Sequence, residues 1–341
     1  DVERSRGLGD VYKRQVWAWA SSIGEPYAEF DAQTVHRNRS TNMTRGAWNG
    51  MGRDSGCVGI VGLGLIGGSI GLDLLSQGIE VQGLVHRSAT AERAMQRGLV
   101  TAVSTDPSCL AHCDLVILAL PIPALLHPPA ELVAALPADA VVTDVGSVKQ
   151  PVLDTWNDRH SRFVASHPMA GTAQAGVEAG QRDLFQGRPW IATPDADTDP
   201  KALAVVEDLA GRLGSRWFTA AASQHDQAVA MISHMPVLVS AALLRAAGDE
   251  RDPEIRALAQ ALASSGFADT SRVGGGNPDL GVAMASSNRE AVLKALAAYR
   301  WSLEQLEDAV IKTNWDQLHK ELTRTQALRP GFLNTDAEFN P

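Results

Sequence analysis

A glycine-rich turn between two apolar runs constrains the fold of this chain more than any other feature. The run 57–61, Cys-Val-Gly-Ile-Val, is apolar and rich in β-branched residues, which is typical of a strand buried in a parallel sheet. The turn has the spacing GxGxxG, at Gly62, Gly64 and Gly67, and an amphipathic run follows it until Gly78, which suits the left-handed end of a helix. The first glycine permits the tight turn, the second lets the backbone approach a pyrophosphate, and the third lets helix and strand pack closely. This order of strand, turn and helix predicts a dinucleotide-binding unit.

The end of the next predicted strand, 81–85, indicates which dinucleotide to expect. NAD enzymes usually place a carboxylate there to hold the ribose hydroxyls. This chain has Arg87 instead, whose guanidinium suits a bidentate pair with a 2′-phosphate, and the hydroxyls of Ser88 and Thr90 lie close by. We therefore expect NADP, with NAD as the alternative, and we also weigh Arg87 as a solvated surface arginine. The expected cofactor contacts are Gly62, Gly64, Leu65, Ile66, Gly67, His86, Arg87, Ser88, Thr90 and Pro121.

Strand and helix signals alternate up to about residue 222. Further apolar runs are predicted as strands at 114–122, 140–149, 162–171, 189–194 and 215–220. The alternation predicts the α/β class, with an N-terminal Rossmann-type doubly wound sheet. Ligands bind beyond the carboxyl ends of the strands in such sheets, so the strand ends mark Pro121, Ser147, Lys149 and His167 as candidate site residues.

From Ser223 the strand signals stop and four apolar or amphipathic helices are predicted. The first extends over 223–248 with a break at Pro236, and the second ends at Gly266. The third and fourth cover 288–312 and 314–328. Helices this apolar need burial on more than one side, so we expect an all-α C-terminal domain that forms a homodimer. The alternative is that they bury only against each other and the sheet.

Composition excludes several classes of protein. The chain has 341 residues and a net charge of −9, which disfavours a nucleic-acid partner. No apolar run approaches the roughly 20 residues of a membrane span, so no membrane partner is expected. The three cysteines are at Cys57, Cys109 and Cys113, a spacing unlike a metal site, so we expect no metal and a reducing, cytoplasmic location.

Residues 1–50 differ from the rest, with three tryptophans and a polar run but no sustained period. We interpret them as a disordered extension or a gene-model artefact, with Met51 as the start. The expected domains are then 51–222 for the dinucleotide and 223–328 for substrate and dimerisation, followed by a tail at 329–341 that is too short for a regulatory domain.

Two other segments carry candidate polar groups. Arg272 lies in a glycine-rich connection at 269–281 that we predict to be non-helical, where its guanidinium suits a carboxylate. His234 lies on an apolar helix beside the proline break.

Five stretches resemble the prephenate and arogenate dehydrogenase family of tyrosine biosynthesis: VGLGLIGGS, TDVGSVK, SHPMAGT, SQHDQAVAMISHMP and LASSGFADTSRVGGGNPDLG. The resemblance runs from about Cys57 to Leu328 and is greatest to the short form without a regulatory domain. It implies oxidation of a cyclohexadienol that carries a ring carboxylate and a three-carbon side chain. Hydride passes to a nicotinamide, and the ring loses CO2 and becomes aromatic.

The resemblance also suggests roles for individual residues. His167 is the expected acceptor of the ring hydroxyl proton, because a neutral imidazole titrates near working pH. The resemblance implies that Ser147 orients that imidazole and that Arg272 binds a substrate carboxylate. His234 and Thr172 are expected to line the same pocket. The competing interpretations are that Ser147 caps a helix, His234 is a core histidine and Arg272 pairs with a neighbouring aspartate.

The choice of substrate is less constrained than the reaction. Some relatives that use prephenate carry an acidic residue where this chain has Ala173, and the short form with Arg87 is more similar to NADP-using arogenate dehydrogenases. We expect arogenate, with prephenate as the alternative. Two further hypotheses are another two-domain dehydrogenase, with Lys294 or Lys312 as a catalytic lysine, and a nucleotide-binding protein without turnover.

Overall fold

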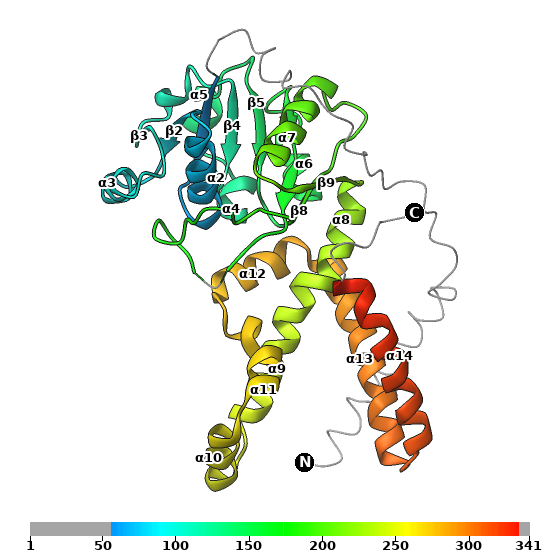
Figure 1. Cartoon of the computed structure of the whole chain (residues 1–341). Coiled ribbons are helices and arrows are strands. Elements are labelled where there is room, and N and C mark those ends of the chain that lie inside the picture. The colour runs from blue at the N-terminus through cyan, green and yellow to red at the C-terminus, as the bar shows by residue number, and fades with distance from the viewer. Residues whose placement is uncertain (1–55, 173, 334–341) are drawn as a thin grey trace. The chain divides into compact units, whose positions relative to one another are not determined.

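The structure is a computed structural model that describes residues 56–172 and 174–333, so the predicted extension at 1–50 lies outside the described residues. Six parallel strands form the larger sheet in the order β3-β2-β1-β4-β5-β6 (Figure 1). They are β1 Cys57–Val61, β2 Glu80–Leu84, β3 Ala102–Ser104, β4 Leu115–Leu118, β5 Val141–Asp144 and β6 Phe163–Val164. The strand order reverses between β1 and β4, which confirms the Rossmann-type doubly wound sheet and puts its ligand crevice at that point.

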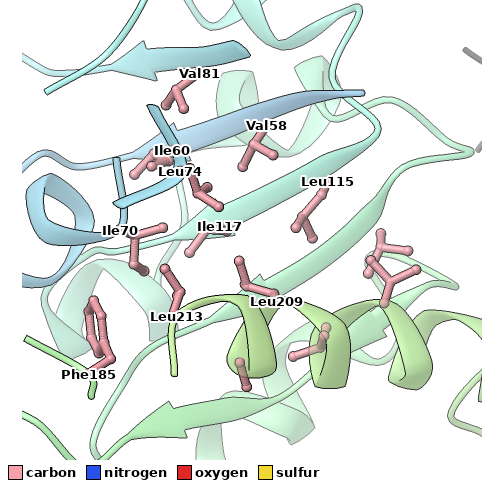
Figure 2. Close-up of a cluster of buried hydrophobic side chains, with 14 of the residues drawn as sticks. Val58, Ile60, Ile70, Leu74, Val81, Leu115, Ile117, Phe185, Leu209 and Leu213 are labelled. Atoms are coloured by element: carbon pink, nitrogen blue, oxygen red, sulfur yellow. The ribbon is translucent and has the colours of Figure 1, made fainter. Parts of the chain in front are cut away.

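Helices cover both faces of this sheet because its strands are apolar on both sides. On one face, α2 Leu65–Ser76 and α7 Pro200–Arg212 bury a cluster of aliphatic side chains, among them Ile70, Leu74 and Leu209 (Figure 2). The elements packed on the other face are η3 Pro107–Leu110, α4 Ile122–Leu126, α5 Ala130–Ala135 and α6 Gln150–Trp156. Helix α3 Ser88–Gln96 follows β2.

The run 162–171, expected as one strand of this sheet, divides between two sheets. Residues 163–164 form β6, and β7 Ser166–Pro168 joins a separate sheet with β8 Pro189–Ala192 and β9 Arg216–Thr219. The prediction of a single strand was wrong because two side chains from the β5–α6 segment form hydrogen bonds with the backbone of Ser166. Its N–H donates to Asp144 Oδ1 (3.1 Å) and its carbonyl accepts from Lys149 Nζ (2.8 Å), which directs the chain out of the main sheet.

The chain is helical after β9, which confirms the all-α C-terminal part. The helices are α8 Ala222–Val229, η4 Ala230–His234, α9 Met235–Gly248, α10 Pro253–Leu262, α11 Ser265–Ser271, η5 Arg272–Gly275, α12 Pro278–Ser287, α13 Arg289–Ile311 and α14 Trp315–Leu333 (Figure 1). The expected break near Pro236 is a wide turn of π-helix, η4, directly before α9. Gly266 lies in the first turn of α11 rather than at a helix end, and Arg272 is helical, because Ser240 on α9 accepts from Gly274 N and holds η5 against it.

One expectation about membranes needs correction. The helical stretch Ala222–Gly248 is long and apolar enough to cross a membrane by length and composition alone. The prediction depended on the absence of an apolar run of about 20 residues, which does not exclude this stretch, because the helix continues through η4 into α9. Length and composition are weak evidence for a span, and this stretch carries His225, Asp226 and His234, all buried in polar contacts.

Candidate active site

The turn between β1 and α2 has the shape that a dinucleotide phosphate requires. Gly62 has a φ of +93°, and a Cβ there would lie 2.4 Å from the carbonyl oxygen of Ala119 on the neighbouring chain segment. A Cβ on Gly67 would lie 2.0 Å from the carbonyl oxygen of Gly62, so the helix packs on the turn only with glycine there. A Cβ on Gly64 would meet nothing within 4 Å. Open space therefore lies at the uncapped N-terminus of α2, where the N–H groups of its first turn favour an anion.

The loop between β2 and α3 carries Arg87, whose guanidinium has no hydrogen-bond partner among the described residues. His86, Arg87 and Ser88 are exposed, and the side chain of Arg87 makes no hydrogen bond or ion pair within the described ranges. Two other arginines of this region are already engaged. Arg93 pairs with both carboxylate oxygens of Glu178 (2.5 and 3.0 Å), and Arg97 donates to backbone carbonyls of the same loop. Arg87 is thus the arginine of this region that remains available to a ligand.

A chain of three side chains forms the centre of the second group of predicted residues. His167, on β7, and His225, on α8, share a hydrogen bond between Nδ1 and Nε2 of 3.0 Å. The other nitrogen of His225, Nδ1, lies 2.8 Å from Asp226 Oδ1. The Asp226 carboxylate also accepts from the backbone N–H groups of Lys149 (2.7 Å) and Gln150 (2.9 Å) at the start of α6. The same contacts therefore join α8 to the carboxyl end of β5.

All three histidines in this region are held neutral. Burial lowers the pKa of His167 well below its ordinary value, and nearby His225 and Lys149 add to the effect. Burial also lowers the pKa of His225, against the opposing hydrogen bond from Asp226. For His234 burial lowers the pKa to about 4. Neutral imidazoles can accept as well as donate hydrogen bonds, which protonated ones cannot.

A buried ion pair lies behind this group and positions it. Lys149 Nζ donates to Asp144 Oδ2 and to the carbonyl of Ser166 (2.8 Å), and both charged side chains are fully buried. Asp144 also accepts from Gly146 N (2.8 Å) and Ser166 N (3.1 Å). The pair thus fixes two backbone segments at once: the turn that carries Ser147 and the strand residue immediately before His167.

Two buried polar atoms near this group lack a partner among the described residues: Ser147 Oγ and His234 Nε2. His234 is 1% exposed and lies beside the backbone of Ser147. Its Nδ1 faces the amide nitrogen of Asn288 (3.3 Å), which itself donates to the carbonyl of Asp226 (2.7 Å). Since Nδ1 accepts, a neutral His234 carries its hydrogen on Nε2. Burial of an unpartnered polar group is costly, so the Ser147 hydroxyl is suited to bind a ligand, whereas the His234 ring also interacts with the backbone of Ser147, which raises the pKa of His234 against the larger effect of burial.

The structure brings together some of the residues predicted from sequence and separates others. Ser147, His167 and His234 lie in one connected group, but Ser147 Oγ makes no hydrogen bond with His167 among the described residues, and His225 holds that imidazole instead. Arg272 is exposed on η5, and no polar contact of its side chain, to a neighbouring aspartate or to this group, occurs in the described part of the chain. Thr172 is exposed, where its hydroxyl accepts from Gln174 N (3.2 Å), and Pro121 precedes α4 at the carboxyl end of β4. These three positions remain predictions.

His225, Asp226 and Asn288 were not predicted from the sequence, and neither Lys149 nor its partner Asp144 was given a role. One signal was available for the first two: a His-Asp pair in the first turns of an otherwise apolar helix. The role of Asn288 has no local signal, because its contacts are with residues about 60 positions earlier.

Comparison with known proteins gives consistent matches over both halves of the chain. Residues 70–219 match the family model of the prephenate dehydrogenase nucleotide-binding domain, and residues 221–324 match that of the prephenate dehydrogenase dimerization domain. A cyclohexadienyl dehydrogenase of Zymomonas mobilis is 31% identical over 83% of this chain and 98% of its own length. A prephenate dehydrogenase of Bacillus subtilis is 26% identical over 80% of this chain and 75% of its own.

Solved structures agree with these matches. The arogenate dehydrogenase of Synechocystis is 42% identical, with a TM-score of 0.69 over 81% of this chain and 100% of its own. The prephenate dehydrogenase of Aquifex aeolicus, in complex with hydroxyphenyl propionate and NAD⁺, is 28% identical, with a TM-score of 0.76 over 82% of this chain and 99% of its own.

Proposed function

The chain belongs to the prephenate dehydrogenase family, and from that premise we propose that it is an arogenate dehydrogenase, which converts L-arogenate to L-tyrosine by NADP-dependent oxidative decarboxylation. Membership makes it an NAD(P)-dependent dehydrogenase of tyrosine biosynthesis with a nucleotide-binding half and a dimerization half. The observation that carries the proposal is the hydrogen bond that holds His167 through Nδ1 and leaves its Nε2 without a partner among the described residues.

The proposed chemistry uses His167 as the proton acceptor. Bound NADP supplies the acceptor for the hydride that leaves the carbon bearing the ring hydroxyl. His167 Nε2 takes the hydroxyl proton as the carbon–oxygen double bond forms, and loss of CO2 then makes the ring aromatic. Because aromatisation drives the reaction, the protein has mainly to position the substrate and accept this proton. A neutral, half-buried imidazole fits that task.

Four further residues are proposed to hold the substrate. The unpartnered Ser147 hydroxyl is suited to a substrate oxygen, and His234 is proposed to line the same pocket. Arg272 is suited to a substrate carboxylate, since its side chain is exposed and forms no ion pair with the described residues. Thr172 follows the His167 strand closely enough in the chain to contribute a hydroxyl.

Arogenate is preferred over prephenate on two grounds. The chain is 42% identical to an arogenate dehydrogenase over 81% of its length. It also has Ala173 where some prephenate-using relatives carry an acidic residue; position 173 lies outside the described residues. The alternative, a prephenate dehydrogenase that forms 4-hydroxyphenylpyruvate with NAD or NADP, keeps the same reaction.

NADP is preferred because Arg87 is exposed and uncommitted where a carboxylate would select NAD. Replacing Arg87 with aspartate is expected to weaken NADP binding by about 10- to 150-fold, the worth of a hydrogen-bonded charge, and to leave NAD binding within a few-fold. Titrations of both cofactors against the variant test this, with the exposed Arg251→Asp as a charge-matched control. An unchanged NADP to NAD affinity ratio contradicts the cofactor assignment.

We also propose a homodimer formed through the helical half, with domains divided near residues 222 and 223. Large apolar side chains are exposed on α10, α13 and α14 in the single chain: Ile255, Leu258, Leu262, Leu293, Trp301, Leu303, Val310, Ile311, Trp315, Leu322, Leu328, Phe332 and Leu333. A second copy of a dimerization domain explains this exposure and that of Ala222–Gly248 better than lipid does, because the stretch also carries buried polar groups. A cytoplasmic location and the absence of nucleic-acid partners remain predictions from composition.

Steady-state assays with arogenate and prephenate, each with NADP and NAD, test the substrate and cofactor together. We expect the highest kcat/KM for arogenate with NADP. A higher value for prephenate would move the chain to the alternative function. Turnover of neither substrate by folded enzyme would contradict the proposal as a whole.

A further inference from the structure

We propose that His225 and Asp226 form a proton relay with His167, which fixes the tautomer of His167 and receives the positive charge when His167 takes the substrate proton. The proposal rests on the proposed function of His167 and adds two residues that act through it. Its basis is an uninterrupted line of hydrogen bonds, from Asp226 to His225 Nδ1 at 2.8 Å and from His225 Nε2 to His167 Nδ1 at 3.0 Å.

The placement of hydrogens follows from the far end of the line. Asp226 Oδ1 and Oδ2 accept from the backbone N–H groups of Lys149 and Gln150, which can only donate. Asp226 therefore acts as an acceptor at both oxygens, and it requires a hydrogen on Nδ1 of His225. The remaining nitrogen of His225, Nε2, then has a lone pair and requires a hydrogen on Nδ1 of His167. Nε2 of His167 is left as the lone pair that accepts a proton.

Burial of His225 and Asp226 stabilises this arrangement of hydrogens. His225 is 2% exposed and Asp226 is 6% exposed, so water cannot replace either hydrogen bond without opening the packing of α8 on the start of α6. Each imidazole has two possible tautomers in the absence of such a partner. Here the carboxylate selects one tautomer for both rings, and only that tautomer leaves His167 ready to accept at Nε2.

The relay also accounts for the charge formed in the reaction. When the ring O–H bond breaks and an N–H bond forms at His167 Nε2, the Nδ1 hydrogen of His167 can move to His225 Nε2. The positive charge then lies on His225, 2.8 Å from the Asp226 carboxylate, and His167 is neutral again. No electrons are exchanged in this step, and the proton leaves by the reverse route through His167, which is half-buried rather than closed off.

The other charged groups around His225 oppose or support this transfer. Lys149 bears the opposing positive charge, and its partner Asp144 offsets it, both from the β5–α6 segment. His234 on η4 and His167 on β7 are neutral. Asp226 is thus the carboxylate in hydrogen-bond contact with the relay, and Asp144 supports it from farther away.

Two variants of His225 separate its proposed roles. In His225→Leu, His167 loses both the acceptor that selects its tautomer and the group that takes the positive charge, so kcat is expected to fall about 100-fold while KM changes less than about three-fold. In His225→Gln, the amide oxygen accepts from His167 Nδ1 and restores the tautomer, although it cannot take the proton. We expect His225→Gln to recover about ten-fold in kcat over His225→Leu. Gln227→Leu, on the exposed face of the same helix, is the matched control and should behave as the wild type.

A spectroscopic readout makes the test independent of rate. In the NADP complex of the ¹⁵N-histidine-labelled protein, NMR should show His167 with its hydrogen on Nδ1 in the wild type and in His225→Gln, and a mixture of tautomers in His225→Leu. Cofactor titration and thermal melting verify that each variant is folded.

Three results would overturn the relay: a wild-type His167 with its hydrogen on Nε2, a His225→Leu enzyme with normal kcat, or equal losses in the leucine and glutamine variants. A parallel His167→Asn variant keeps this test apart from the proposed function. If His167→Asn loses turnover and His225→Leu does not, only the relay fails. If His167→Asn turns over normally, the proposed role of His167 fails first.

Discussion

Replacing Lys149 with methionine tests whether the buried ion pair holds the active-site strands in place. Lys149 and Asp144 are both fully buried, and the ammonium bonds the carboxylate and the carbonyl of Ser166. Methionine fills most of the volume but leaves Asp144 with two backbone donors and no countercharge. Removing one member of a buried pair costs about 3–5 kcal/mol of unfolding free energy. At a few degrees per kcal/mol for a chain of this size, the Tm should fall by roughly 10 °C.

A double-mutant cycle supplies the sharper measurement. Asp144→Asn alone should also destabilise, and the double variant should cost less than the sum of the two single variants by about 2 kcal/mol, because the unpaired charge is gone. Lys312→Met is the control, since Lys312 pairs with Asp308 on an exposed helix face and such pairs contribute at most about 1 kcal/mol. Thermal and denaturant unfolding give the values. Additive single effects, or a Lys149→Met variant as stable as the control, would refute the reasoning.

The pH dependence of the Lys149→Met variant follows from the same pair. Burial raises the pKa of Asp144 above its ordinary value, and loss of the ammonium raises it further. Between the unfolded and the raised native pKa, the native state then holds a proton that the unfolded state lacks, so stability falls as pH rises through this window. The destabilisation should therefore be smaller at pH 5 than at pH 8, and an opposite trend would indicate that Asp144 keeps its charge.

Three further predictions concern the reaction. Gly64→Ala should fold with an unchanged Tm but bind NADP more weakly, because its methyl group enters open space at the N-terminus of α2, whereas Gly67→Ala should unfold at a markedly lower temperature. Calorimetry and cofactor titration compare the two variants. Equal effects of both substitutions would contradict the assignment of the turn. The pKa of the acid limb of the kcat/KM profile should lie below the value of roughly 6.5 for a free imidazole, because burial lowers the pKa of His167 and keeps it an acceptor as pH falls. An acid-limb pKa above about 7 would count against His167 as the base. Arg272→Ala should raise the substrate KM by about 30-fold, which corresponds to the loss of one hydrogen bond to a charged group, and should leave the cofactor KM unchanged. An unaltered substrate KM would show that Arg272 does not bind the substrate.

The nucleotide half was predictable where its signals are local. The strand 57–61, the glycine turn and the helix end at Gly78, with a φ of +76°, all appear in the structure as expected. Each depends on residues within a few positions of one another, since backbone conformation at a glycine and the period of an apolar run are properties of a short segment. The predicted strand 162–171 failed for the opposite reason: the groups that divide it, Asp144 and Lys149, lie about 20 residues earlier in the chain.

What the sequence determined by itself is a glycine turn for a dinucleotide and an imidazole at a strand end, because both follow from residue type and order, and the resemblance of the surrounding motifs implied the kind of chemistry. The tertiary structure decided how that imidazole is held. His167 meets His225 across 58 residues, and Asp226 meets the start of α6 across 77, so only the packing of α8 against the sheet creates the hydrogen bonds that set their protonation. Protonation state is a property of surroundings, and surroundings are assembled from residues that are distant in the sequence.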